Sequence, residues 1–310
     1  MKKYSNFRWI LSIVLLSMFI LPVIVQADSG QSNLQFDLQG DAHYNRYNFT
    51  DIKKPYDGID GWAELKTTYW IDNNKALSPY LSIIPSFTTE SEFWWQRNFQ
   101  IDVGFQWYPV ETFVPKRKVH DKDQYEYLRN IRLFLLSAWR EYYDEPKKAD
   151  PEDTDFQIGM DYYYDNLDNR FDDKSFIAVV WTNAGFRKTN FSLKNYDAFL
   201  WTGNIKIGPR FKPAKTILLP YLVSDWTYVP KYDERWWENF LRVGAGTRWY
   251  PWFPKMKDDI GFFEDFLKRF NIYVEVLHNV AWFGDKPNNS VKETDFRIGL
   301  SFSTGGFFKK

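Results

Sequence analysis

Bulky apolar residues and polar residues alternate along most of the chain after residue 30. Between Phe99 and Trp107 every second residue is large and apolar, and each residue between is polar or glycine. The stretches Asp155–Asp165 and Phe296–Ser303 alternate in the same way. Successive side chains of a β-strand point to opposite faces of the sheet, so a period of two predicts strands that have one apolar face.

Twelve segments of about 11–17 residues show this alternation. They are residues 33–49, 60–72, 77–88, 97–108, 129–143, 154–165, 174–187, 196–210, 216–228, 237–249, 270–283 and 294–304. Strands of ordinary soluble sheets have about five or six residues, whereas a tilted strand that spans a bilayer needs about 9–11. The lengths therefore favour a membrane β-barrel over a soluble sandwich.

Tryptophan and tyrosine gather at the ends of these segments. Examples are Trp94-Trp95, Trp107-Tyr108, Trp139, Tyr142-Tyr143, Trp201, Trp236-Trp237, Trp249-Tyr250 and Trp282. Amphipathic rings prefer the headgroup zone of a bilayer, so aromatic girdles at both rims are typical of outer-membrane barrels. The alternative is an aromatic-rich soluble jelly roll or sandwich, which would bury its rings between two sheets.

Matching peptides recur in the same order about 141 residues apart. Pro79–Leu81 returns as Pro220–Leu222, and Trp107–Pro109 returns as Trp249–Pro251. Because the matches keep their order along the chain, the simplest interpretation is an internal duplication.

The duplication predicts an all-β fold, a twelve-stranded antiparallel transmembrane β-barrel built from two six-stranded repeats, residues 33–165 and 174–305. An even strand number is typical of single-chain outer-membrane barrels. Closure also removes the two unpaired edges that six open strands would have.

A longer connection after residue 250 has a helical pattern. Ile260, Phe263, Phe266 and Phe270 are spaced three or four residues apart, with charged residues between them. This spacing predicts a short amphipathic helix on the periplasmic rim. We expect the helix to lie against the inner leaflet or to cap the lumen, and the alternative is that it docks a periplasmic partner.

The first residues have the features of an export signal. Lys2, Lys3 and Arg8 precede an apolar stretch from Trp9 to Val25, and small residues follow. Residues 1–27 are therefore predicted to be a cleaved secretory signal peptide and residues 28–310 the barrel. An uncleaved N-terminal anchor is the alternative, because the apolar run is slightly long.

Composition excludes several other classes of protein. The mean hydropathy of −0.51 excludes a bundle of membrane helices, and 20% aromatic residues exclude a disordered chain. The absence of cysteine excludes a disulfide framework. Without residues 1–27 the chain has 37 Lys and Arg against 40 Asp and Glu, which does not favour a nucleic-acid partner.

If the apolar faces of the strands meet lipid, the polar faces line the interior. The residues predicted to face the lumen are Glu64, Lys66, Gln100, Asp102, Gln106, Arg132, Arg140, Asp161, Tyr163, Lys206, Arg210, Arg242, Arg248, Tyr273, Glu275 and Arg297. Their charges either pair to plug a narrow barrel or line a hydrated conduit, in which Tyr163 and Tyr273 are available to stack on sugar rings. The segments near Pro79 and Pro220 do not alternate cleanly, so the pattern assigns no facing there.

The sequence gives little support for a catalytic site. A barrel phospholipase needs a serine, a histidine and an orienting group, but none of His43, His120 and His278 lies beside a serine in a recognisable pattern. The chain has no metal-ligand cluster and no phosphate-binding glycine loop. We therefore expect no enzyme activity, no cofactor and no bound metal.

Several peptides of the second half resemble a known family. Val243–Tyr250, Asn271–Glu275 and Phe296–Phe302, together with Pro220–Leu222, resemble the C-terminal barrel of the phage-adsorption outer-membrane receptors. More loosely they are similar to the barrels of cellulose and poly-glucosamine secretion porins. The resemblance covers roughly residues 216–304 and implies an outer-membrane location in a Gram-negative bacterium and a link to exported polysaccharide. Those proteins carry helical-repeat arms that this chain lacks, so any periplasmic scaffold is expected to be a separate polypeptide.

These features predict the outer-membrane component of exopolysaccharide export or of a related envelope function. The expected partners are outer-membrane lipid, a polysaccharide and the separate scaffold protein. Two alternatives stay open, a closed structural or adhesion barrel that serves as a docking surface or phage receptor, and an outer-membrane lipid-modifying enzyme.

Overall fold

The structure is a computed structural model of the whole chain. It describes residues 33–47, 56–89, 97–114, 126–143, 154–165, 176–189, 196–213, 216–229, 239–252, 262–282 and 294–303. The predicted signal peptide and His120 lie outside these residues.

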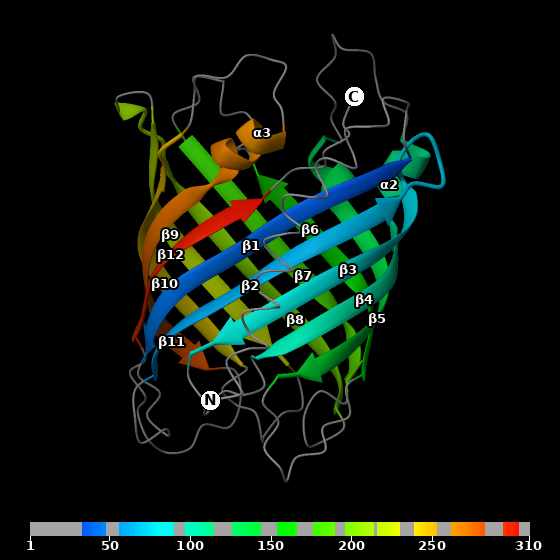
Figure 1. Cartoon of the computed structure of the whole chain (residues 1–310), viewed down its shortest axis with the longest axis horizontal. Coiled ribbons are helices and arrows are strands. Elements are labelled where there is room, and N and C mark those ends of the chain that lie inside the picture. Colours follow the sequence, from blue (N-terminus) through cyan, green and yellow to red (C-terminus); the bar gives the residue numbers. More distant parts are fainter. Residues whose placement is uncertain are drawn as a thin grey trace.

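Twelve strands form one closed antiparallel barrel in which each strand pairs with its sequence neighbours and β1 pairs with β12 (Figure 1). The strands are β1 Leu34–Tyr47, β2 Tyr56–Tyr69, β3 Leu77–Thr88, β4 Asn98–Trp107, β5 Ile131–Tyr142, β6 Thr154–Asp165, β7 Phe176–Thr189, β8 Tyr196–Pro209, β9 Ile217–Tyr228, β10 Phe240–Tyr250, β11 Asn271–Trp282 and β12 Thr294–Ser303. The predicted all-β, twelve-stranded antiparallel barrel is confirmed, and each predicted segment overlaps one strand.

The largest difference in strand bounds is at β2, which begins at Tyr56 and not at residue 60, and which ends at Tyr69 and not at residue 72. The Asp72 carboxylate accepts hydrogen bonds from the backbone N–H groups of Ala76 and Leu77, each at 2.9 Å. Lys75 has φ of 56°, in the left-handed region. The side chain of Asp72 thus closes the turn before β3, because aspartate readily bonds to nearby backbone in turns.

The strand registers decide which side chains share a face, because residues directly opposite each other point to the same side of the sheet. Lys66 pairs with Ser82, and Ser82 pairs with Asp102. The Lys66 ammonium on β2 also donates a hydrogen bond of 2.8 Å to Gln106 on β4. This hydrogen bond crosses over β3. Such a contact is possible on the concave face alone, so these polar side chains point inward.

The opposite face of the barrel is an apolar surface with aromatic ends. Exposed aliphatic residues near the middle of the strands include Leu81, Val103, Leu135, Ile158, Leu222, Val243, Val276 and Ile298. Exposed aromatic residues near the strand ends include Tyr69, Phe176 and Trp249 at one end of the barrel and Trp139, Trp201 and Tyr228 at the other. An aliphatic band between aromatic girdles matches a bilayer. A soluble sandwich would have these rings between two sheets.

In the part of the chain that the structure describes, three short helices lie between strands at one end of the barrel, where Figure 1 labels α2 and α3. They are α2 Pro109–Phe113, the 3-10 helix η2 Glu126–Asn130 and α3 Phe262–Arg269. We call this end, which also carries the turn from β2 to β3, the helical end. Of the helices that the structure describes, none is both long and apolar enough to cross a membrane.

Helix α3 occupies part of the segment predicted to be helical and packs near the rim. The ring of Phe266 lies 5.1 Å from the ring of Phe302, and Phe302 is on the outward face because its neighbours Ser301 and Ser303 face inward. The described contact therefore favours a helix that lies against the outer wall over one that caps the lumen. Its periplasmic location is still a prediction.

Candidate functional site

The inward face of the barrel holds the residues that sequence pattern assigned to the lumen. They are Glu64 and Lys66 on β2, Gln100, Asp102 and Gln106 on β4, Arg132 and Arg140 on β5, Asp161 and Tyr163 on β6, Lys206 on β8 with Arg210 directly after it, Arg242 and Arg248 on β10, Tyr273 and Glu275 on β11, and Arg297 on β12. The registers bring them to one surface, where two groups make direct contacts. Whether this surface lines a passage is a separate question.

The first group, which we call the Arg132 cluster, consists of Lys66, Tyr80, Gln106, Arg132 and Asp161. The Arg132 guanidinium donates to both oxygens of Asp161, with Nε at 2.9 Å from Oδ1. The Gln106 Oε1 atom accepts from Lys66 Nζ at 2.8 Å and from Arg132 Nη1 at 2.9 Å. The Lys66 ammonium also lies 4.2 Å from the centre of the Tyr80 ring. Arg132 is therefore paired with a carboxylate of the neighbouring strand.

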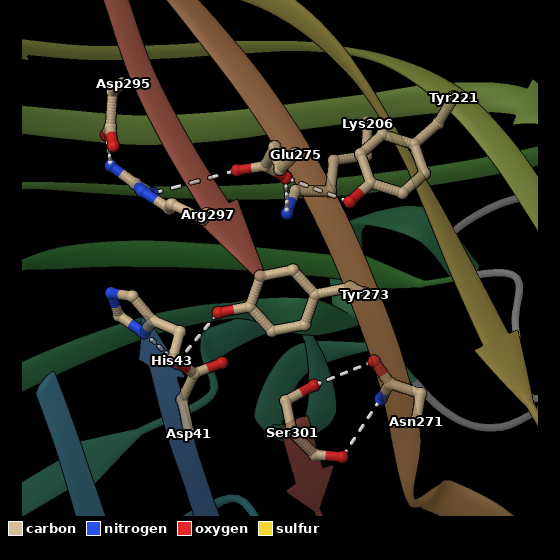
Figure 2. Close-up of polar contacts among 10 residues, drawn as sticks. All are labelled: Asp41, His43, Lys206, Tyr221, Asn271, Tyr273, Glu275, Asp295, Arg297 and Ser301. Carbon is tan, nitrogen blue, oxygen red and sulfur yellow. Dashed lines mark hydrogen bonds and ion pairs between the residues drawn. The ribbon is translucent and has the colours of Figure 1, made fainter. Parts of the chain in front are cut away.

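The second group, the Glu275 cluster, consists of Lys206, Tyr221, Glu275, Asp295 and Arg297 (Figure 2). Glu275 Oε2 accepts hydrogen bonds from Lys206 Nζ at 2.7 Å and from the Tyr221 hydroxyl at 2.9 Å. Its Oε1 lies 3.7 Å from Arg297 Nη1, and Arg297 also bonds to Asp295. Glu275 is only 2% exposed, so this one carboxylate compensates two cations away from bulk water.

A third set of contacts lies beside the Glu275 cluster. Asp41 Oδ1 accepts a hydrogen bond from the Tyr273 hydroxyl at 2.9 Å and lies 2.5 Å from His43 Nδ1. Figure 2 shows the three side chains meeting below the Glu275 cluster. Since Tyr273 is on β11 and Asp41 on β1, this contact crosses over β12 and ties the last strands to the first.

The longest of these contacts cuts across the interior. Lys206 is on β8 and Glu275 is on β11, so their 2.7 Å ion pair passes over β9 and β10. Neighbouring strands are about 4.7–4.9 Å apart, and the two backbones are therefore about 14 Å apart along the wall. Side chains that meet over this distance form a chord, which narrows the lumen on this side.

Tyr80 and Tyr221 belong to the inward face but were not assigned to it by the sequence pattern. A Cβ atom added to Gly104 would lie 2.3 Å from the Tyr80 ring, and one added to Gly246 would lie 2.7 Å from the Tyr221 hydroxyl. Each tyrosine thus lies over the glycine directly opposite it on the next strand. The shared Pro-Tyr-Leu tripeptide and the glycine in the facing segment were the signals that could have found both residues.

The described histidines do not form a catalytic group with a serine. The contacts of His43 are with Asp41 and with the Tyr273 ring, 6.4 Å away. His278 is on the outward face, with Nδ1 3.3 Å from the Thr294 hydroxyl. Among the residues that the structure describes, no three metal-ligating side chains come together.

Comparison with known proteins gives structural similarity alone. No protein-family model matches the chain, and no curated protein sequence matches it. Similar solved structures include an outer-membrane channel from Pseudomonas putida F1 (8% identity, 90% of this chain, 97% of that chain, TM-score 0.38). The β domain of the Bordetella autotransporter BrkA (11% identity, 86% and 98%, TM-score 0.36) and the NanC porin (10% identity, 86% and 98%, TM-score 0.35) are also similar. The closed sheet and the apolar outer belt of this chain give it the architecture of an outer-membrane β-barrel.

Proposed function

We propose that this chain is the outer-membrane component of exopolysaccharide export, or of a related envelope function, and that it gives a hydrated sugar chain a polar route through the bilayer. The observation that carries the proposal is the contrast between the two faces of one sheet. The outer face is aliphatic with aromatic rims, and the inner face carries paired charges and tyrosine rings.

The inner wall has the two kinds of group that a sugar chain needs. Sugar hydroxyls bond to charged and amide side chains, and Gln100, Gln106 and Asp102 supply these on β4. The apolar face of a pyranose ring packs on an aromatic ring, and Tyr163, which faces inward on β6 and is 50% exposed, supplies such a ring. Ligand sites commonly combine aromatic surface with a few placed polar groups in this way.

The proposal includes a location and partners. Residues 1–27 direct export and are removed, outer-membrane lipid surrounds the belt, and a separate periplasmic protein supplies the scaffold. We expect no nucleic-acid partner, because the mature chain has a slight excess of negative charge.

Deletion of the gene tests export directly. We expect polymer to accumulate in the periplasm and to disappear from the cell surface, and a plasmid copy to restore surface polymer. The assay is fractionation followed by sugar analysis of both compartments. Normal surface polymer in the deletion strain would contradict the proposal.

The chord between Lys206 and Glu275 favours a second candidate, a closed barrel that serves as a structural or adhesion platform, such as a phage-docking surface. Conductance of the purified barrel in planar lipid bilayers separates the two. A stable ion current supports the passage, whereas no current at any voltage or salt concentration supports the closed barrel.

We also propose that the chain is not an enzyme. The His43 ring contacts an aspartate and a tyrosine, without a described serine among its bonded partners. Replacement of His43 and His278 by alanine should leave the lipid composition of the outer membrane unchanged, as measured by mass spectrometry of extracted lipids.

A further inference from the structure

One inward-facing arginine of the second repeat is placed between two tyrosine rings. The Arg248 guanidinium carbon lies 5.5 Å from the centre of the Tyr273 ring and 6.0 Å from that of Tyr221. Both distances are within the range of cation–π contact. The three residues come from β10, β11 and β9, and the registers place Arg248 opposite Tyr273.

This arginine lacks a carboxylate partner. Among the described residues Arg248 forms no ion pair within 4.0 Å, and its Nε atom is buried with no hydrogen-bond partner. The nearest acidic group of this wall, Glu275, is already engaged by Lys206, Tyr221 and Arg297. Arg248 therefore shares the charge of Glu275 with two other cations and has no carboxylate of its own within ion-pair distance.

In the first repeat, by contrast, an inward-facing arginine is paired with a carboxylate. Arg132 is held by both oxygens of Asp161, and a neutral residue, Gln106, stands before Trp107 where Arg248 stands before Trp249. The two tyrosine-over-glycine pairs are alike. The difference between the repeats is thus an arginine in the second whose hydrogen-bond partner is the Tyr221 hydroxyl and which has no carboxylate within ion-pair distance.

We propose that Arg248, held beside the Tyr221 and Tyr273 rings, binds an acidic sugar unit, whose carboxylate meets the guanidinium. The inference rests on the proposed function and names the chemical class of the exported polymer, a polysaccharide that contains carboxylate sugars. An arginine fork matches a carboxylate with two parallel hydrogen bonds, which a neutral sugar cannot supply.

Lys206 adds to this preference for an anion. Its ammonium lies 5.1 Å from the centre of the Tyr221 ring, on the ring that Arg248 also approaches. A carboxylate that enters between the tyrosines therefore meets two cations, of which Lys206 is hydrogen-bonded to Glu275 and Arg248 has no carboxylate within ion-pair distance. The entering anion completes the charge balance of this part of the wall.

Isothermal titration calorimetry on the mature barrel, folded in detergent, tests the assignment. The probes are a hexamer of mannuronate, which is acidic, and maltohexaose, a neutral oligomer of the same length. We expect the acidic oligomer to bind about tenfold more tightly or better, and Arg248→Gln to remove that advantage, because hydrogen bonds between charged groups contribute about one decade or more of affinity. Arg46→Gln is the matched control, since Arg46 is exposed on the outward face of β1, and it should leave binding unchanged.

A second variant covers the case in which Arg248→Gln does not fold. Arg248→Lys keeps the charge but loses the fork, so it should bind the acidic oligomer more weakly than the unaltered barrel. Equal binding of both oligomers, no binding of either, or full affinity in both variants would overturn the site. Displacement of the acidic oligomer by inorganic phosphate as effectively as by free mannuronate would also overturn it, in favour of a general anion site. Calorimetry measures binding without transport. A negative calorimetric result would therefore overturn the acidic-sugar site and leave the proposed export function, which the gene deletion tests, unaffected.

Discussion

At the scale of single residues, the interior is organised by carboxylates that hold the cations of neighbouring strands. Glu275 bonds to Lys206 and lies near Arg297, and Asp161 holds Arg132 through both oxygens. Burying a charge is costly unless it is paired and hydrogen-bonded. Removal of one carboxylate therefore leaves uncompensated cations in a restricted space.

Glu275→Gln should destabilise the barrel by on the order of 3 kcal/mol, because it breaks a buried ion pair and leaves Lys206 and Arg297 without their shared anion. The measurement is the free energy of unfolding in urea from lipid vesicles. Glu141→Gln, at an exposed outward position of β5, is the control and should change stability by less than about 1 kcal/mol. A loss below about 0.5 kcal/mol in Glu275→Gln would mean that water, and not Glu275, compensates the two cations.

Gly104→Ala should destabilise the barrel by about 1 kcal/mol, because the new Cβ would lie 2.3 Å from the Tyr80 ring and would push this ring into the lumen. The same change in a Tyr80→Ala background should cost much less, since the clash is then absent. A double-mutant cycle of urea unfolding measures this coupling. Equal costs in both backgrounds would show that Tyr80 does not rest on Gly104.

At the scale of elements, the barrel wall is set by strand pairing and its rim by short helices. The apolar contact of α3 with the end of β12 consists of Phe266 and Phe302, 5.1 Å apart. Phe270 extends the same contact to Trp252, whose ring is 5.0 Å away. Helix α3 and the residue that follows it thus contact the end of β12 and the segment directly after β10.

Phe266→Ala should remove this tie and lower stability by roughly 1–2 kcal/mol, less than for a fully buried phenylalanine because Phe266 is half-buried. Faster cleavage within the β10–β11 connection by added protease gives an independent readout. Phe211→Ala, at a residue that is 52% exposed, is the control. If both variants are cut at the same rate, the contact with Phe302 does not hold the helix.

Sequence pattern predicted the elements well where alternation is regular and less well elsewhere. It identified all twelve strands. It did not assign the faces of β3 and β9, because proline and consecutive apolar residues interrupt the period of two there. The registers with β4 and β10 resolve both strands and place Tyr80 and Tyr221 inside.

At the scale of the whole molecule, the outer apolar belt is the part of the barrel that contacts the lipid bilayer. Leu222 is 64% exposed near the middle of β9, whereas Tyr69 is exposed at the end of β2. In a bilayer the first meets hydrocarbon and the second meets headgroups. A charge has very different costs at these two depths.

Leu222→Arg should cost roughly 2–4 kcal/mol, and Tyr69→Arg about 0–1 kcal/mol, because the penalty for a lipid-facing arginine falls from the bilayer midplane to its interface. Unfolding from lipid vesicles measures both values. Equal costs at the two positions, or stable folding of the chain in detergent-free buffer, would contradict the membrane belt.

The sequence by itself determined the local features of this protein: the strands, their antiparallel order and the two faces of the regular ones. These follow from alternation and turn chemistry, which act between near neighbours. The tertiary structure alone decided which charges meet across the interior, since Lys206 reaches Glu275 over two intervening strands and Arg132 finds Asp161 while Arg248 finds no carboxylate. Such contacts depend on the register and curvature of the closed sheet, and no short stretch of sequence encodes that geometry.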